Sequence, residues 1–294
     1  MTAFTSLGRG DPRYPQLVRE LHDPPGELFV RGKPDVLAAP GVAVVGARSC
    51  SAYGAQVARS LARELADAGV VVISGLARGI DGEAHRGALE GGGRTVAVLG
   101  CGIDRDYPRS HAELARRIVL AGAVVSEYPV GVEPAPWRFP ARNRIIAALA
   151  LATVVVEARE RSGALITADF ALELGRDVFA VPGEITSALS SGTNDLLRQG
   201  AAPLTSVRDV LDSIGVAPPA GARTAPVSNA AAELLGLLGD GARAIDELTQ
   251  ASGIPPGEVA AALVELELAG LAAQAEGVYR TFSPGRSRVA RERA

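Results

Sequence analysis

The sequence predicts a doubly wound α/β fold built on a mostly parallel sheet, followed by a small winged-helix domain. Between residues 41 and 214, short apolar runs rich in valine alternate with segments of helical periodicity, which is the pattern of repeated strand–helix–strand units. A stretch rich in proline and glycine at 215–228 then interrupts this rhythm. Beyond it, three helix-like segments precede a hairpin pattern, an order typical of winged helices.

The large domain, residues 41–214, is expected to contain six buried strands. They are predicted at 42–45, 70–73, 95–99, 123–126, 153–157 and 178–181. Nearly continuous apolar runs of this length are typical of parallel strands that are covered on both faces. Helices are predicted between and after these strands, at 53–68, 80–90, 110–120, 142–151 and 163–174.

The segment ahead of this domain, residues 1–40, is expected to be an irregular lead-in. Five prolines between positions 12 and 34 surround one short apolar run, Leu28-Phe29-Val30. Because proline has no backbone N–H to donate to a sheet, at most an edge strand is predicted there.

The C-terminal part is expected to form a separate domain. Residues 215–228 are predicted to be an interdomain linker of limited flexibility, because they contain several prolines. A winged helix is predicted at 229–282, with helices at 230–238, 244–251 and 256–269 and a hairpin at 271–282. The arginine-rich residues 283–294 lack an apolar pattern and are predicted to be a disordered basic tail.

Composition predicts a cytoplasmic protein. The first ten residues contain no apolar segment typical of an export signal, and no stretch of eighteen uncharged apolar residues predicts a membrane span. Cys50 and Cys101 are the only cysteines and lie far apart. They predict neither a disulfide framework nor a zinc site.

The formal net charge of −3 conceals an uneven distribution along the chain. Residues 229–282 hold eight acidic and two basic residues (net −6), residues 283–294 one acidic and four basic (net +3), and the first 228 residues are neutral. This balance excludes a protein that coats nucleic acid through overall positive charge, but it allows a local basic cleft. Lys33 is the single lysine. Nearly all the cations are therefore arginines. The planar guanidinium group of arginine suits contacts with phosphate, although a GC-rich genome would also favour arginine over lysine.

The loop after the first strand carries Gly46, Arg48 and Ser49. In an open α/β sheet, ligands bind at the carboxyl ends of the strands, where glycine loops and helix N-termini admit an anion. This loop is therefore either a phosphate seat or a tight turn with a solvated arginine. It is not a dinucleotide fingerprint, because G-x-G-x-x-G would need glycine at Arg48 and at Ser51.

The loops after the second and third strands are less specific. Ser74-Gly75 and Gly79 permit a close backbone bend, and Asp81 can cap the next helix. After the third strand, Gly100-Cys101-Gly102 is followed by acidic residues that a pyrophosphate would avoid. No cofactor is predicted.

The segment from Trp137 to Ile146 packs three arginines and two large aromatic residues just ahead of a predicted apolar helix. Cations there oppose the helix dipole unless an anion is bound, which favours a phosphate partner. Phe139 could stack on a base. Equally, both aromatic side chains could be core and the arginines could pair with Glu133 or Glu157.

The start of the predicted helix at 163–174 carries Ser162, Gly163 and Thr167, which predict another anion-receptive N-terminus or ordinary serine capping. The sequence contains no motif that indicates a catalytic residue. The three histidines lack the spacing of a nucleophilic or metal motif. His85 could pair with Asp81 on one helix face, and we interpret it as structural.

The predicted third helix of the winged-helix domain, 256–269, carries three glutamates and no basic residue. Because phosphate neutralisation dominates DNA affinity, we expect this domain to contact protein rather than DNA.

Seven motifs in order resemble the signature of the DprA/Smf family. They are Gly46-x-Arg48 with Tyr53-Gly54, Ser74-Gly75-x-Ala77-x-Gly79-Ile80-Asp81 with His85, Ser126-Glu127, Phe139-Pro140-x-Arg142-Asn143-Arg144, Ser162-Gly163-x-Leu165-Ile166-Thr167, Pro182-Gly183 and Gly192-x-Asn194. The resemblance spans residues 12–214 and implies a Rossmann-like core with a variable winged helix.

The resemblance implies a protein without catalytic turnover that binds and protects incoming single-stranded DNA in natural transformation. It also implies a homodimer that loads the RecA recombinase onto the strand. On the matching positions, DNA phosphate binding is assigned to Gly46, Arg48, Ser49, Ser74, Gly75, Gly79, Arg142, Asn143, Arg144, Ser162, Gly163 and Thr167, and base stacking to Phe139.

Two enzymatic alternatives are weaker. A Rossmann-like phosphoribohydrolase of the lysine-decarboxylase-like group needs a P-G-G-x-G-T-x-x-E pattern, but the nearest segment, 162–170, lacks the second glycine and the glutamate base. A dinucleotide-dependent oxidoreductase would need the fingerprint that is missing.

Overall fold

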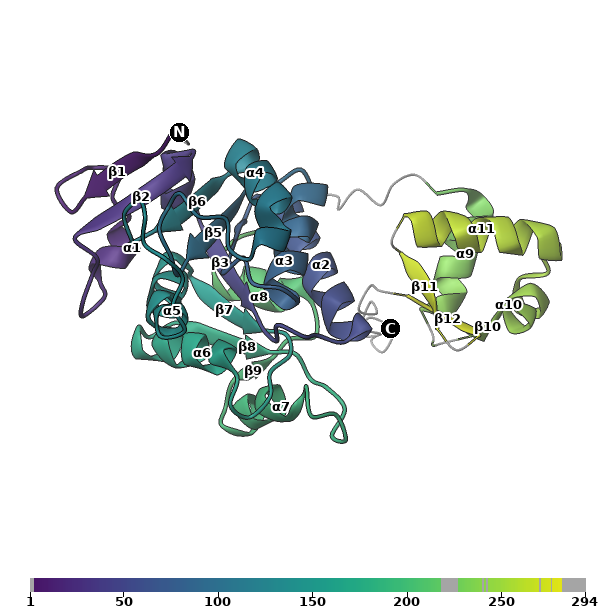
Figure 1. Cartoon of the computed structure of the whole chain (residues 1–294). Helices are drawn as coiled ribbons and strands as arrows, with labels where there is room; N and C mark the ends of the chain where they lie inside the picture. Colours follow the sequence, from purple (N-terminus) through teal and green to yellow (C-terminus); the bar gives the residue numbers. More distant parts are fainter. Residues whose placement is uncertain are drawn as a thin grey trace. The chain divides into compact units, whose positions relative to one another are not determined.

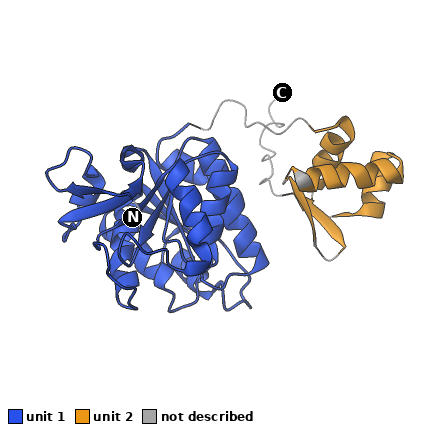
Figure 2. Cartoon of the chain, turned by 45° about the horizontal axis from the view of Figure 1, so that its top comes forward, with its two compact units in different colours: residues 1–219 blue, residues 220–294 orange. Residues whose placement is uncertain are grey.

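The computed structural model describes residues 3–217, 227–239, 241, 243–269, 271–275 and 277–281. The chain divides into two compact units, residues 1–219 and 220–294, each described by itself below (Figure 2). The predicted tail at 283–294 and most of the predicted linker at 215–228 lie outside the described residues.

A nine-stranded sheet forms the centre of the large unit (Figure 1). Its spatial order is β1-β2-β6-β5-β4-β3-β7-β8-β9. The strands are β1 Thr5–Gly8, β2 Glu27–Gly32, β3 Gly41–Val45, β4 Val71–Ser74, β5 Thr95–Leu99, β6 Ala123–Ser126, β7 Ala152–Val155, β8 Asp177–Ala180 and β9 Ala202–Pro203. Strands β3 to β9 pair in parallel, whereas β2 pairs antiparallel with both β1 and β6. The predicted doubly wound, mostly parallel sheet is confirmed.

The strand order reverses between β3 and β7. From β3 the chain steps outward through β4 and β5 to β6, then returns to place β7 on the other side of β3. The helices involved are α2 Ala52–Asp67, α3 Ile80–Glu90, α4 Ala112–Ala121, α5 Arg138–Leu149 and α6 Gly163–Glu173. In open α/β sheets this reversal is where ligands bind, so it marks where to look for a site.

Apolar layers cover both faces of the sheet at β3. Val42 and Val44 belong to the cluster formed with α2 and α3, whereas Ala43 and Val45 belong to the cluster formed with α5 and α6. Every residue of β3 is buried. Burial on both faces is the reason that this strand has no polar alternation in the sequence.

The expectation of at most an edge strand at Leu28-Phe29-Val30 is wrong. These residues lie in β2, which is paired on one side with β1 and on the other with β6. The prolines do not interrupt the strand, because Pro24 and Pro25 precede it and Pro34 follows it. The lead-in also contains the short helix α1, Gln16–Arg19, and the 3-10 helix η1, Pro34–Ala38.

The helix predicted at 142–151 begins at Arg138 instead. Pro140 is its third residue, in the first turn, where a missing N–H leaves no helical hydrogen bond unmade. Consequently Arg142 and Arg144 lie in the second turn rather than ahead of the helix. The dipole argument for a bound anion therefore applies to Arg138 and not to them.

Besides α1, the helices α7 and α8 of the large unit were not predicted. Helix α7, Ser191–Arg198, contains the motif Gly192-x-Asn194. Helix α8, Val207–Ser213, begins with the Asp209 carboxylate accepting hydrogen bonds from the backbone N–H groups of Thr205 and Ser206 at 2.8 Å each. The Ser-x-x-Asp spacing was a recognisable capping signal for α8.

The small unit is a winged helix, as predicted. Its helices are α9 Asn229–Leu238, α10 Ile245–Ser252 and α11 Pro256–Leu268, and its sheet has the order β10-β12-β11. The hairpin pairs β11 Ala272–Ala275 with β12 Val278–Thr281, and the unpredicted two-residue strand β10, Arg243–Ala244, adds to its edge. Leu234, Leu248 and Leu263 are fully buried between the helices.

Helices α2 and α3 pack closely at Gly87. A Cβ atom at this position would overlap the Arg59 carbonyl oxygen and lie 2.9 Å from the Arg59 Cα. We expect Gly87→Ala to lower the free energy of unfolding by roughly 2 kcal/mol, because the two helix backbones would have to separate. Urea unfolding followed by the fluorescence of Trp137, the single tryptophan, measures this change.

The control for Gly87→Ala is Gly26→Ala, because a Cβ atom at Gly26 would meet open space. It is expected to change the free energy of unfolding by at most about 0.5 kcal/mol. Equal effects of the two substitutions would contradict the packing argument.

No helix within the described residues combines the length and the apolar character that a membrane crossing requires.

Candidate functional site

A pocket of about 210 Å³ opens at the reversal of strand order, where β3 and β7 end. We call it the strand-end pocket. Eight of the residues predicted from the sequence line it: Gly46, Arg48, Phe139, Arg142, Asn143, Ser162, Gly163 and Thr167. They come from the loop after β3 and from helices α5 and α6 with their N-terminal caps, so tertiary folding brings together residues that are far apart in the sequence.

Arg142 is a buried cation in the wall of this pocket. Only 4 % of the residue is exposed. Its Nη1 donates to the carbonyl oxygens of Gly75, at 2.9 Å, and of Val98. Within the described part of the chain, no carboxylate oxygen lies within 4.0 Å of the guanidinium. Burial lowers the pKa of Arg142 to about 10, so it is charged at neutral pH and lacks a direct anionic partner.

The N-terminus of α6 forms the opposite wall. Ser162 caps this helix, since its side chain accepts a hydrogen bond from the Ala164 N–H at 3.3 Å. Asn143 ties α5 to this end by donating to the Gly163 carbonyl at 2.9 Å. The Thr167 hydroxyl, buried in the pocket wall, has no hydrogen-bond partner among the described residues. A helix N-terminus beside an unpartnered hydroxyl and a buried guanidinium favours an anion.

Arg48 and Phe139 form the mouth of the pocket. Arg48 is exposed and its guanidinium carbon lies 5.2 Å from the centre of the half-buried Phe139 ring, within the range of a cation–π contact. Three further exposed arginines, Arg78, Arg159 and Arg161, lie in loops after β4 and β7. Because parallel strands end at one edge of the sheet, these cations share the edge that holds the pocket.

One carboxylate also reaches the strand-end pocket. Asp81 Oδ2 accepts hydrogen bonds from the backbone N–H groups of Gly75, at 3.1 Å, and Ala77, at 3.3 Å. Burial raises the pKa of Asp81, and the charge of Arg142 opposes this rise. A Cβ at Gly75 would lie 2.6 Å from both Asp81 Oδ2 and Arg142 Nη2. Glycine is therefore required where these two side chains approach the backbone.

A carboxylate of the protein itself lies at the N-terminus of α2. The buried Glu157 accepts hydrogen bonds from Ser51 N at 2.9 Å and from Ser51 Oγ at 2.5 Å. Ser49, in the same loop, is exposed and is not among the pocket-lining residues described. Gly46 and Arg48 are thus the members of this loop that face the pocket.

The structure also places Ser74 and Gly79 outside the strand-end pocket. Ser74 is fully buried, and its hydroxyl donates to the Val44 carbonyl at 2.7 Å. Gly79 has a φ of 73° and packs so closely on the preceding loop that a Cβ would lie 2.7 Å from the Arg48 carbonyl oxygen. Both residues therefore shape the loops that carry Arg48 and Gly75.

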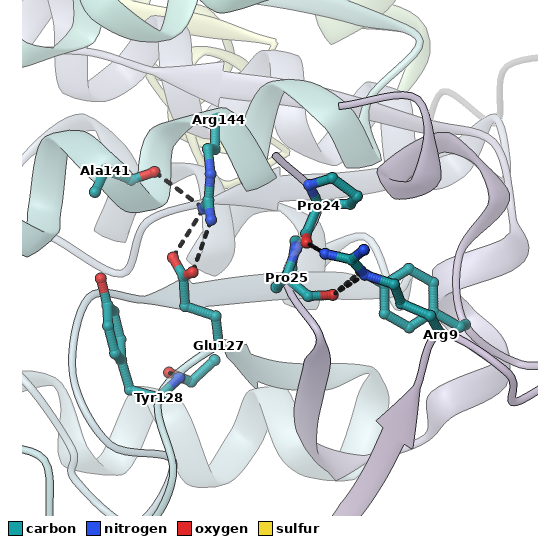
Figure 3. Close-up of polar contacts among 9 residues, drawn as sticks. Arg9, Pro24, Pro25, Glu127, Tyr128, Ala141 and Arg144 are labelled. Atoms are coloured by element: carbon teal, nitrogen blue, oxygen red, sulfur yellow. Dashed lines mark hydrogen bonds and ion pairs between the residues drawn. The ribbon is translucent and has the colours of Figure 1, made fainter. Parts of the chain in front are cut away.

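Arg144 is not among the residues that line the strand-end pocket, and its side chain points toward Glu127 (Figure 3). Its Nη1 and Nη2 donate to the two carboxylate oxygens at 2.8 and 2.7 Å. The sequence left open a pairing of the arginines with Glu133 or Glu157. Within the described chain, neither Arg142 nor Arg144 forms an ion pair with these two glutamates. In the same view, Arg9 donates to the carbonyl oxygens of Pro24 and Pro25, which holds the lead-in loop.

Two of the three histidines, His85 and His111, are buried in the large unit. His85 is fully buried, and its Nδ1 lies 2.7 Å from Thr95 Oγ1 rather than against Asp81. The His111 Nδ1 lies 2.9 Å from the Leu76 carbonyl oxygen and donates to it. Within the described residues, no group of three His, Cys, Asp or Glu side chains could hold a metal ion.

The sequence reasoning missed Tyr107 and Arg78. Both line a second pocket that adjoins the first and also contains Gly75. Tyr107 stacks on Phe139 with ring centres 5.3 Å apart. No spacing connects these two aromatic residues in the sequence, although both lie in segments that follow predicted strand ends.

Comparisons with known proteins show the family of this chain. The family model of DNA recombination-mediator protein A matches residues 5–215, and that of the DprA winged helix domain matches residues 217–278. The putative DNA processing protein DprA of Mycobacterium tuberculosis is 46% identical over 264 residues, which cover 87% of this chain and 68% of the relative. Protein Smf of Escherichia coli is 42% identical over 277 residues, which cover 90% of this chain and 74% of the relative.

Two solved structures are similar to this chain. DprA of Streptococcus pneumoniae has a TM-score of 0.69 at 46% identity and covers 71% of this chain and 74% of its own. DNA processing protein A of Helicobacter pylori, described for its single-stranded DNA binding mode, has a TM-score of 0.65 at 30% identity. The match covers 72% of this chain and 95% of the Helicobacter pylori chain. Family models that span nearly the whole chain, and relatives this similar, establish that it belongs to the DprA/Smf family of DNA recombination-mediator proteins.

Proposed function

We propose that this chain binds single-stranded DNA at the carboxyl edge of its sheet, without catalysing a reaction on it. The observation that carries the proposal is Arg142, a buried guanidinium with no carboxylate within 4.0 Å in the described chain. A buried charge that makes no direct ion pair is stabilised when an anion contacts it. A phosphate of a nucleic acid, held also by Arg48 and the N-terminus of α6, supplies that anion.

Phe139 is proposed to stack on a base, because its half-buried ring lies beside the phosphate-binding groups at the pocket mouth. Gly46, Gly75, Asn143, Ser162, Gly163 and Thr167 complete the proposed phosphate-binding set. The proposal gives Ser74 and Gly79 an indirect role, through the loops they shape. Ser49 and Arg144 remain candidates for contacts outside the pocket.

A gel shift that compares three ligands tests this function. We expect the chain to shift a single-stranded oligonucleotide at lower protein concentration than a duplex of the same length. A free mononucleotide is expected to compete weakly, because it offers one phosphate group where the strand offers several. Tighter binding of the mononucleotide than of the strand would overturn the proposal.

A nucleotide hydrolase is the second candidate, and one observation keeps it in view. Asp81 is the acidic residue among those described as lining the pocket. Its Oδ2 already accepts two backbone hydrogen bonds, which holds it as a loop anchor rather than as a free base. Incubation with nucleoside monophosphates and detection of released base discriminates the two functions, since the binding protein is expected to release none.

The biological setting follows from family membership. We propose that the chain protects incoming DNA in natural transformation, acts in the cytoplasm as a homodimer, and loads a RecA-type recombinase onto the strand. The winged helix is proposed to contact a protein partner, because the described residues of α11 include Glu258, Glu265 and Glu267 and no basic residue.

Removal of the winged helix gives a direct prediction. A chain ending at residue 217 is expected to keep its affinity for single-stranded DNA within about tenfold, roughly 1.4 kcal/mol, because the proposed phosphate ligands all lie in the large unit. Filter binding at two salt concentrations measures the affinity. A larger loss would assign part of the DNA interface to the small unit.

A further inference from the structure

One face of α11 packs inside the small unit, and the opposite face is open to solvent. Four apolar residues form the packed face: Val259, Ala262, Leu263 and Leu266. On the open face Ala261 is exposed, and Val264 is 51% exposed. Successive residues of a helix are turned by about 100°, so this apolar pair lies between the exposed Glu258 on one side and the exposed Glu267 on the other. We call these four residues, Glu258, Ala261, Val264 and Glu267, the α11 face.

The acidic side chains of the small unit have no cationic partner among the described residues. Those described are Glu233, Asp246, Glu247, Glu258, Glu265 and Glu267. Every ion pair between described residues lies in the large unit. Glu265 and Glu267 accept hydrogen bonds from backbone N–H groups, of Ser228 at 2.7 Å and of Gln274 at 3.2 Å. These bonds fix the two carboxylates but do not neutralise them, so the charge of α11 suits a cationic ligand.

The C-terminal residues of the chain carry the complementary charge. Residues 283–294, which we call the basic tail, contain one glutamate and four arginines: Arg286, Arg288, Arg291 and Arg293. The tail begins two positions after the end of β12 at Thr281, which pairs with Ala272. Leu271 N donates to the Leu266 carbonyl at 2.8 Å. The chain therefore leaves the hairpin beside the last turn of α11, which is the negative end of the helix dipole.

The basic tail is long enough to follow the whole of α11. The 13 residues of α11 make a helix about 20 Å long, whereas an extended segment of the length of the tail spans at most about 40 Å. A segment joined to the chain next to its binding surface has an effective concentration in roughly the millimolar range. Exposed ion pairs are individually weak, and this tethering is what populates such a contact.

We propose that the basic tail binds along the α11 face of its own winged helix, with its arginines beside Glu258 and Glu267 and Val289 on Val264. Val289 is the one large apolar residue of the tail. This inference goes beyond the proposed function, because it involves neither DNA nor the large unit. A protein partner that approaches α11 through basic residues would have to displace the tail, so the contact is autoinhibitory.

Fluorescence anisotropy with a labelled peptide of residues 283–294 tests the contact. The full chain is compared with a chain that ends at residue 282, which keeps every described residue. We expect the shortened chain to bind the peptide at least tenfold more tightly, because the tail of the full chain already covers the α11 face. Binding is also expected to weaken when salt is raised from about 0.05 M to about 0.5 M, because exposed charges are then screened.

Three results overturn the contact within one chain. The first is equal binding of the peptide by the two chains, and the second is binding by neither. The third is competition by the tail that appears only at high protein concentration, because the tail would then bind a second copy of the chain.

The double variant Glu258→Gln, Glu267→Gln of the shortened chain tests the binding surface. It is expected to bind the peptide about fivefold more weakly, because two charges are lost while the side-chain shapes are kept. The matched control is Glu173→Gln, at an exposed glutamate of α6, which is expected to leave peptide binding unchanged. Unchanged binding by the double variant, or equal weakening by the control, places the peptide elsewhere and overturns the α11 face.

Discussion

An Arg142→Met variant is expected to bind single-stranded DNA about a hundredfold more weakly than the unmodified chain, a loss of ~2.7 kcal/mol. Methionine keeps the bulk of the side chain but removes the buried charge that lies between the two pockets. Charge-assisted bonds to phosphate are among the strongest polar contacts. Because one phosphate partner is lost, the slope of log affinity against log salt is expected to fall by about one.

Two variants control for this result. Arg142→Lys keeps the charge but not the planar fork, so an intermediate loss is expected. Arg144→Met removes a cation two residues away that is already paired with Glu127, and a loss of less than about fivefold, ~1 kcal/mol, is expected. Circular dichroism melting of each variant separates lost binding from lost folding. If Arg144→Met reduced affinity as much as Arg142→Met, the pocket would not be the phosphate site.

The second large effect is a loss of stability in mild acid caused by His85. The Thr95 hydroxyl donates to the Val72 carbonyl at 2.7 Å, so the hydrogen shared by His85 and Thr95 comes from the imidazole Nδ1. Burial, together with the charges of His111 and Arg142, lowers the pKa of His85 to about 3 from 6.5. The folded chain therefore keeps this ring neutral throughout the physiological range.

The sign of the effect follows from proton uptake. Between pH 6.5 and about pH 3, the unfolded chain binds a proton at His85 that the folded chain does not. The free energy of unfolding therefore rises with pH across this window. His85 alone is expected to remove roughly 3 kcal/mol on going from pH 7 to pH 4, since each unit is worth about 1.4 kcal/mol.

Urea unfolding at a series of pH values measures this contribution. His85→Asn is expected to show a distinctly smaller fall in stability between pH 7 and pH 4 than the unmodified chain. Asp81, whose pKa is raised by burial, acts in the opposite direction but is present in both proteins. The matched control is His22→Asn, at an exposed histidine, which is expected to leave the pH profile unchanged. Parallel profiles for the unmodified chain and His85→Asn would refute the assignment.

The sequence by itself determined the α/β class, the positions of the buried parallel strands and the family. Parallel strands covered on both faces are apolar throughout, so their runs are visible without any long-range information. The role of β2 was not visible, because its pairing with β6 joins segments that are nearly a hundred positions apart. The seven motifs lie at strand ends and helix starts, where local geometry restricts the residue type.

Only the tertiary structure decided which arginines face the pocket. Arg142 and Arg144 lie two positions apart in α5. Successive residues of an α-helix are turned by about 100°, so their side chains lie roughly 200° apart around the axis. Arg142 is therefore buried at the edge of the sheet, with no ion pair to a carboxylate in the described chain, whereas Arg144 pairs with Glu127. The sequence motif contains both arginines and does not distinguish between them. Which guanidinium is available to a phosphate depends on what packs against each face of α5.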